Sequence, residues 1–96
     1  MTSIIAHLNK VFDSRVRLGI MAILSANESA DFNTMKELLD ITDGNLASHL
    51  KALESIEYVR SKKQFIGRKP NTQYVITKLG YHSFQEHLSA LERLVG

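Results

Sequence analysis

The sequence predicts a mostly helical α+β domain. Apolar residues recur at intervals of three and four over most of the chain, both before residue 57 and after residue 77. Only residues 58–77 break this pattern, because β-branched and aromatic residues there flank a group of turn formers, as in a β-hairpin. The 96 residues suffice for one domain, and their 44 % apolar content supports a small core that a second subunit would extend.

The composition excludes several kinds of site. The chain has no cysteine, so disulfides and thiolate metal centres are ruled out. Neither a basic and then apolar leader nor an apolar run of about 18 residues occurs, so we expect a cytoplasmic protein without a membrane partner. No cofactor is expected.

Two helices are expected in the first third of the chain, at residues 3–12 and 14–27. Ser3 and Ser14 precede them and are suitable N-caps. The stripe of the first helix comprises Ile4, Ile5, Leu8, Val11 and Phe12. That of the second comprises Val16, Ile20, Ile23 and Leu24.

A short helix is expected at residues 34–40. Thr34 is followed three residues later by Glu37, which is the spacing of a capping box. The preceding polar loop has room for a short extended piece around Phe32. The residues expected to face inward are Met35, Leu38 and Leu39.

A longer helix follows, with Thr42 as its N-cap and Asp43 as its first residue. Its narrow apolar stripe consists of Leu46, Leu50, Leu53 and Ile56. A short helix, a turn and a longer helix over residues 34–57 form a helix-turn-helix pattern. This pattern alone is only moderately specific, since consecutive short helices are common.

The face of the longer helix opposite its leucines carries short polar side chains. Such side chains reach base edges in a major groove without steric bulk, and a helix start offers free amides to a phosphate. Asp43 would repel phosphate, so we expect it to cap the helix. The alternative is an ordinary solvated face. The candidate DNA contacts are Thr42, Gly44, Asn45, Ser48, His49 and Lys51.

Residues 58–77 predict a β-hairpin, with a loop in "GRKPN" that is longer than two residues. Six of the twelve Lys and Arg residues, and no Asp or Glu, lie between Tyr58 and Lys78. A phosphate backbone would relieve their mutual repulsion and release counterions. The alternative is protection of a sheet edge against aggregation, which needs only one or two lysines.

The basic residues of the hairpin divide into two groups. Arg68 and Lys69 lie at the tip, where we expect them to enter a minor groove. The phosphate contacts expected elsewhere on the hairpin are Lys62, Lys63 and Asn71. Arg15 and Arg17, at the start of the second helix, are expected either to contact phosphate or to pair with Asp13.

A helix capped by Thr77 is expected over residues 78–95. Its apolar residues follow the three-and-four spacing of a helix that packs along another helix. We expect both terminal helices to form a homodimer interface through Ile4, Ile5, Leu8 and Phe12 and through Tyr81, Phe84, Leu88, Leu91 and Val95.

The blocks "TDGNLASHLKALE", "GRKP" and "YVITKLG" resemble those of small one-domain MarR/ArsR-like winged helix-turn-helix regulators. The resemblance extends roughly from Phe12 to Leu91. It implies a dimer that binds duplex DNA, with a recognition helix in the major groove and a wing, residues 58–77, near the minor groove. Sensors of the ArsR type use cysteines or paired His and Asp sets, and this chain has no cysteine.

The sequence contains no evident arrangement of catalytic side chains. Ser48 and His49 are neighbours on one helix and point about 100° apart, without a carboxylate to orient the histidine. His82 and His87 are five residues apart, so a zinc site on one helix face is not predicted. No polar cluster indicates a small-molecule effector. The sequence therefore predicts a sequence-specific regulator of transcription, and the alternative is a winged-helix module for protein or single-stranded RNA.

Overall fold

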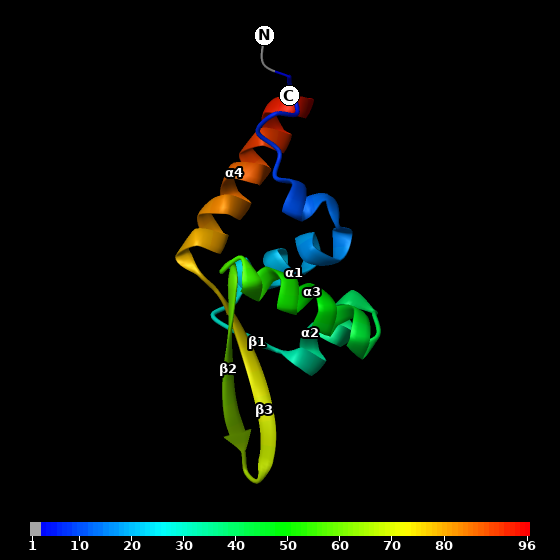
Figure 1. The fold of residues 1–96 in the computed structure, drawn as a ribbon, viewed down its shortest axis with the longest axis vertical. Helices are drawn as coiled ribbons and strands as arrows, with labels where there is room; N and C mark the ends of the chain where they lie inside the picture. The colour runs from blue at the N-terminus through cyan, green and yellow to red at the C-terminus, as the bar shows by residue number, and fades with distance from the viewer. Residues whose placement is uncertain (1–2) are drawn as a thin grey trace.

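The structure is a computed structural model, and it describes residues 3–96. The molecule is elongated, with extents of 57 × 25 × 22 Å. A central body of three α-helices has a β-hairpin projecting from one end and a long helix from the other (Figure 1). The elements in order are η1 (Lys10–Asp13), α1 (Arg15–Ala26), β1 (Ala30–Asp31), α2 (Phe32–Leu39), α3 (Asp43–Ser55), β2 (Val59–Ile66), β3 (Lys69–Ile76) and α4 (Lys78–Val95). The prediction of a mostly helical α+β fold is confirmed.

The core lies where α1, α2 and α3 meet the base of the sheet. Ile20 and Met21 of α1 and Met35 of α2 are fully buried there. Leu46, Leu50 and Leu53 of α3 face the same core, as their spacing predicted. Ile56, expected on the same stripe, lies beyond the end of α3 and is 38 % exposed. Burying a side chain of this size contributes about 1.5–3 kcal/mol, so these contacts fix the orientation of α3.

The sheet is antiparallel, with the strand order β1-β3-β2. The register pairs Ile66 with Lys69, which leaves Gly67 and Arg68 as a two-residue turn. Gly67 has φ +65°, and glycine at the first central position is the pattern of a type II′ turn, whose twist suits a hairpin. The expectation of a longer loop was wrong, because the strands stay paired through Pro70.

The expected helix over residues 3–12 is also wrong. Residues 4–8 form turns and a bend, and only the 3₁₀ helix η1 follows. Asn9 accounts for the interruption, since its extended backbone is held by distant groups. Its N–H donates to His87 Nδ1 at 3.0 Å, and its side-chain amide donates to the Tyr58 hydroxyl at 3.0 Å. These tertiary bonds override the helical periodicity.

The start of α2 differs from the predicted capping box. Asp31 is the N-cap, and its Oδ1 accepts from the Thr34 N–H at 2.7 Å. Hydrogen bonding by Thr34, first through its side chain and then through its N–H, lowers the pKa of the Asp31 carboxyl. Met35 is buried as expected and Leu39 is half-buried, but Leu38 is 65 % exposed. The helix begins two residues earlier than Thr34 because Asp31 ends the short strand β1 and caps the helix directly.

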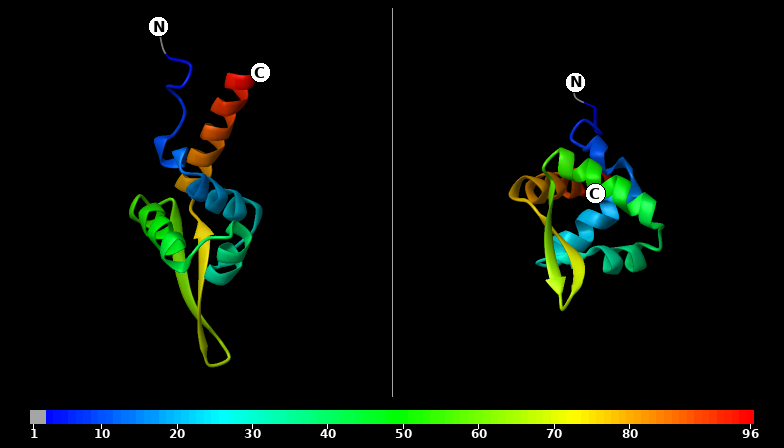
Figure 2. Two further views of the ribbon diagram at one scale, coloured as in Figure 1. Left: turned by 90° about the vertical axis from the view of Figure 1, so that its right-hand side faces the viewer. Right: turned by 60° about the horizontal axis from the view of Figure 1, so that its bottom comes forward.

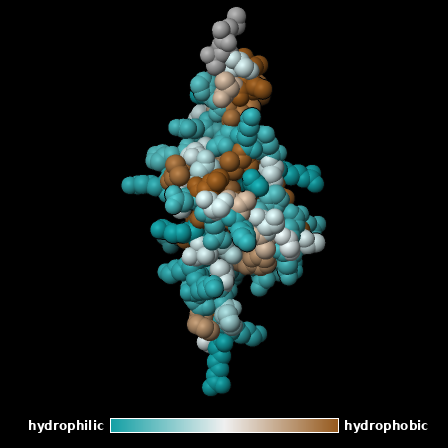
Figure 3. Space-filling view, in the orientation of Figure 1, coloured by the Kyte–Doolittle hydropathy of each residue, from teal (hydrophilic) through white to brown (hydrophobic). Residues whose placement is uncertain are grey.

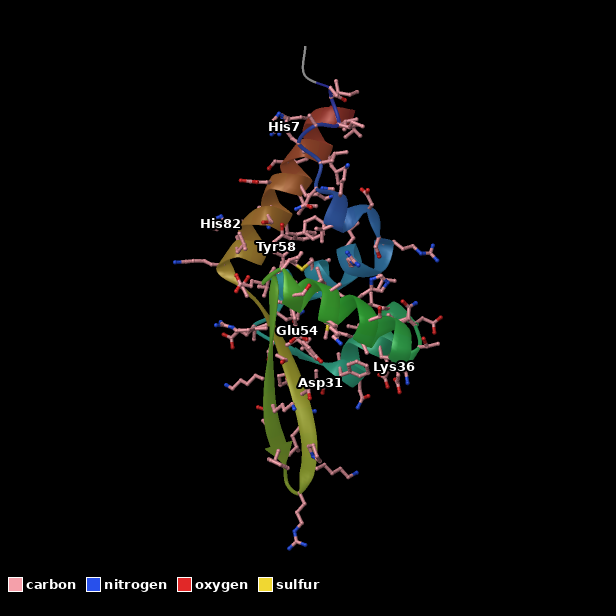
Figure 4. All side chains as sticks on the ribbon, in the orientation of Figure 1. His7, Asp31, Lys36, Glu54, Tyr58 and His82 are labelled. Atoms are coloured by element: carbon pink, nitrogen blue, oxygen red, sulfur yellow. The ribbon has the colours of Figure 1, made fainter. Side chains whose placement is uncertain are left out.

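A compact joint connects α3, the hairpin and α4 at Tyr58 (Figure 4). The Tyr58 carbonyl accepts from the Thr77 N–H at 3.0 Å, and the Thr77 hydroxyl accepts from the Gly80 N–H at 2.9 Å. Thr77 is thus the N-cap of α4, as predicted. A Cβ at Gly80 would lie 2.1 Å from the Tyr58 carbonyl oxygen, so only glycine permits this approach. The joint sends the hairpin and α4 in opposite directions (Figure 2).

Candidate nucleic-acid interface

Helix α3 presents a polar face to solvent. Its buried Leu46, Leu50 and Leu53 hold the helix against the core. The residues of the opposite side follow from the 3.6-residue period, and the exposed ones include Asn45, Ser48 and Lys51. These side chains are free of contacts with the core and are short enough, apart from the lysine, to approach a groove closely.

The first turn of α3 is open. The Thr42 hydroxyl accepts from the Asn45 N–H at 3.2 Å, which confirms Thr42 as the N-cap. A Cβ built at Gly44 would meet nothing within 4 Å. Packing therefore does not require glycine at this position, and the open backbone is suited to close approach by a phosphate.

Asp43 does not cap the helix, contrary to expectation. Its carboxylate lies 2.8 Å from Lys36 Nζ of α2. The pair is exposed and contributes little to stability. It does offset the negative charge that would otherwise stand beside the helix start, where a phosphate is expected.

His49 is joined to α1 by Arg17. The Arg17 Nε–H donates to His49 Nδ1 at 3.1 Å. Because Nδ1 accepts, the ring is neutral and its Nε2 carries the proton. Burial, followed by the charge of Arg17, lowers the pKa of the His49 imidazole. His49 is thus set to donate from Nε2, and the sequence did not reveal this because its partner is 32 residues away.

The hairpin has two chemically different faces. Ser61 donates to Glu54 of α3 at 3.3 Å, which identifies the face turned toward that helix. Tyr74, opposite Ser61, is close to Glu54 as well: burial, with a contribution from Glu54, raises the pKa of its phenol. Successive residues of a strand point to opposite faces. Lys63 therefore lies, with Ser61, on the hairpin face that is turned toward α3, and Lys62 lies on the opposite hairpin face.

Asn71 belongs to a network at the base of the projecting part of the hairpin. Its Oδ1 accepts from Gln73 at 2.7 Å and from Gln64 at 3.4 Å, and its amide donates to Asp31 at 3.5 Å. Its side chain thus links β1 to the hairpin. The tip beyond it is exposed, including Arg68 and Lys69.

The residues expected at a dimer interface lie in the N-terminal segment and along the whole of α4, and they are not alike. Phe12 and Phe84 are buried within the protomer, where their rings meet edge to face with centroids 5.6 Å apart. Leu8 and Leu88 are half-buried. The exposed members are Ile4, Ile5, Tyr81, Leu91 and Val95. Apolar surface, brown, gathers at the end formed by the N-terminal segment and the last turns of α4 and over part of the central body, whereas the hairpin end is mostly teal and polar (Figure 3).

The structure of residues 3–96 adds two findings about other kinds of site. Its His, Asp and Glu side chains form no group of three or more that could hold a metal ion. Within the same residues, each helix is too short or too polar to cross a bilayer. His87 is 5 % exposed and accepts the Asn9 N–H, so it anchors the N-terminal segment to α4.

Comparisons with known proteins identify the family of this chain. The profile of the winged helix DNA-binding domain matches residues 16–95. An uncharacterised protein of Methanocaldococcus jannaschii is 40 % identical over 85 residues, which are 88 % of this chain and 92 % of that protein. A transcriptional regulator homologue from Pyrococcus horikoshii OT3 is 35 % identical, with a TM-score of 0.82 over 88 % of this chain and 84 % of its own.

More distant structures share the fold alone. A mutant MarR from E. coli has a TM-score of 0.74 at 13 % identity, over 82 % of this chain and 57 % of its own. The hairpin of β2 and β3 corresponds to the wing of such proteins. Family profile and fold together show that the chain belongs to the winged helix DNA-binding domain family.

Proposed function

We propose that the protein is a homodimeric transcription regulator that binds duplex DNA at specific sequences, with α3 in the major groove and the wing on the minor groove and backbone. The observation that carries this proposal is the exposed polar face of α3, fixed from behind by three buried leucines. Asn45 is suited to pair with adenine, and His49 offers a donor to a guanine acceptor or to a phosphate.

The wing extends the same surface. Its exposed cations are Arg68 and Lys69 at the tip and Lys63 on the hairpin face that is turned toward α3. Each phosphate that they neutralise would release counterions. Arg17 adds to this surface, because only one of its five N–H groups is used by His49. Lys62 and Asn71 support the proposal less, as they lie on the other face of the hairpin.

The dimer is supported by the exposed apolar residues at the opposite end. Ile4 is 78 % exposed and Val95 is 87 % exposed, and the two segments lie beside each other along a groove between the N-terminal segment and α4. A second copy would cover them. Two-fold symmetry then predicts a pseudo-palindromic operator with half-sites about 10 bp apart.

A duplex-binding experiment tests the proposal. Duplexes selected from a random pool are titrated with the protein by fluorescence anisotropy, at several salt concentrations. Asn45→Ala is expected to cost about 1–3 kcal/mol of discrimination at one base pair while leaving the salt dependence unchanged. Absence of duplex binding even at low salt would contradict the proposal and favour a module for protein or single-stranded RNA.

A further inference from the structure

The most basic segment of the chain also exposes two large apolar side chains. Phe65 is 72 % exposed and Ile66 is 61 % exposed, next to the turn at Gly67 and Arg68. Phe65 is absent from the cluster of residues that form or line the core. The fold therefore does not use this ring, although a polar residue would suit an exposed strand equally well.

The position of Phe65 is set by the hairpin register. β1 pairs with β3 only at Gln73 and Tyr74, so the wing is two-stranded beyond them. The part from the pair of Lys63 and Thr72 to the turn spans three residue steps, or about 10 Å. Phe65 sits in this free part, directly opposite Pro70.

The two apolar residues point in opposite directions. Phe65 is four residues after Ser61, which hydrogen bonds to Glu54 of α3, and strand alternation places both on one face. Ile66, one residue further on, lies on the other. Phe65 therefore faces the side of the recognition helix, together with Lys63.

We infer that Phe65 is an apolar wedge that enters the minor groove beside Arg68, partly unstacks a base step and bends the duplex. This inference rests on the proposed function, since it requires the wing to lie on duplex DNA. The minor groove is about 6 Å wide, too narrow for a two-stranded ribbon, so side chains at the tip make the entry. Proteins that bind this groove insert apolar side chains and bend DNA toward the major groove.

Charge complementarity identifies duplex DNA as the occupant of this surface. Six cations and no anion lie between Tyr58 and Lys78, so the ring is surrounded by groups that attract a polyanion. Phosphates on both sides of the minor groove would neutralise Arg68, Lys69 and Lys63 while the ring reaches the bases. An apolar pocket on a protein would cover the ring but would leave these cations without partners.

The test measures bending and unstacking separately from affinity. A duplex selected by the wild-type protein carries donor and acceptor dyes at its ends, and a second copy carries 2-aminopurine at successive positions of the wing footprint. Wild-type protein should change the energy transfer and raise the 2-aminopurine fluorescence at one step. Phe65→Ala should abolish both signals and weaken binding about five- to tenfold, with an unchanged salt slope.

Two further variants make the assignment specific. Phe65→Leu keeps an apolar wedge and should restore most of the bend. Ile66→Ala removes a side chain of comparable exposure from the opposite face and should behave like the wild type. Because both positions are exposed, circular dichroism should show unchanged folding for all three variants.

The outcomes separate the inference from the proposed function. Wild-type protein that binds duplex without bending or unstacking it overturns the wedge and leaves the regulator standing, as does Phe65→Ala with wild-type signals. Equal losses in Ile66→Ala and Phe65→Ala overturn the assignment of the face. Failure of the wild type to bind duplex at all overturns both.

Discussion

At the hairpin end of the protomer the surface is mostly polar and its charged side chains are all basic, whereas apolar surface gathers at the end formed by the N-terminal segment and the last turns of α4 (Figure 3). Arg68 and Lys69 mark the first end, and Ile4 and Val95 mark the second. None of these four residues belongs to the hydrophobic core of the protomer. Under the proposed function, the first end would bind a polyanion and the second an apolar surface, such as that of a second copy.

The largest effect is expected from charges placed in the apolar end. Leu91→Asp with Val95→Asp should convert the proposed dimer to a monomer, because burying an unpaired carboxylate costs several kcal/mol. Both side chains are exposed in the protomer, so its fold should persist. Sedimentation velocity measures the mass.

The choice of these two residues keeps the result interpretable. Leu88 is less suitable, because it packs against the core of its own protomer. Leu38→Asp is the matched control, as Leu38 is 65 % exposed on α2, outside the apolar end. A double variant that sediments as a dimer would refute the interface.

The second effect concerns the basic end. Arg68→Ala with Lys69→Ala should weaken binding to every duplex and reduce the slope of log K against log salt by about 2, as two phosphate contacts are lost. The control, Lys10→Ala with Arg93→Ala, also removes two positive charges, but at positions outside the wing. It should leave the slope nearly unchanged. Equal slopes for the wing variant and the wild type would refute the wing contacts.

Gly44 allows stability and binding to be changed in opposite directions. Gly44→Ala should raise the free energy of unfolding by about 0.5–1 kcal/mol, because nothing obstructs a Cβ there and alanine is the better helix former. The same methyl would stand between the helix start and a phosphate, so duplex affinity should fall. Urea unfolding and anisotropy titration measure the two quantities. Tighter or unchanged binding would show that the duplex does not approach this turn.

Local periodicity was sufficient to predict α1, α3, the hairpin and α4. It failed wherever distant residues decide the backbone. The helix expected over residues 3–12 is interrupted because Asn9 bonds to His87, 78 residues away. The exposure of Leu38 depends on how α2 packs, and helical spacing alone leaves this open. The contact of Arg17 with His49 likewise needs the folded arrangement of α1 and α3.

The predicted site residues also divide into those that local sequence identifies and those whose position depends on distant residues. Thr42 is recognisable as a cap from its place before a helix, and the structure confirms it. Lys62 and Lys63 look equivalent as neighbours in the sequence, and only the bond of Ser61 to Glu54 shows which of them faces α3. The role of Asn71 in joining Asp31 to the hairpin could not be predicted, since it depends on β1 pairing with β3.

The smallest effect is a pH dependence that arises where α3 meets α1. Burial and Arg17 disfavour the imidazolium of His49, so its pKa in the folded state is below the ordinary value of 6.5. Between the folded pKa and 6.5 the unfolded chain binds more protons, and stability rises with pH there. The contribution of His49 is therefore present above pH 6.5 and is lost as pH falls through the folded pKa.

His49→Gln should remove this slope, because a glutamine oxygen can accept from Arg17 without titrating. Urea midpoints measured from about pH 7.5 to about pH 5 should fall more steeply for the wild type than for this variant. All other titrating groups are common to both proteins and cancel in the difference. His82→Gln, which changes an exposed histidine of α4, should keep the wild-type slope. Parallel curves for wild type and His49→Gln would show that burial and Arg17 do not favour the neutral form of the His49 ring in the folded state.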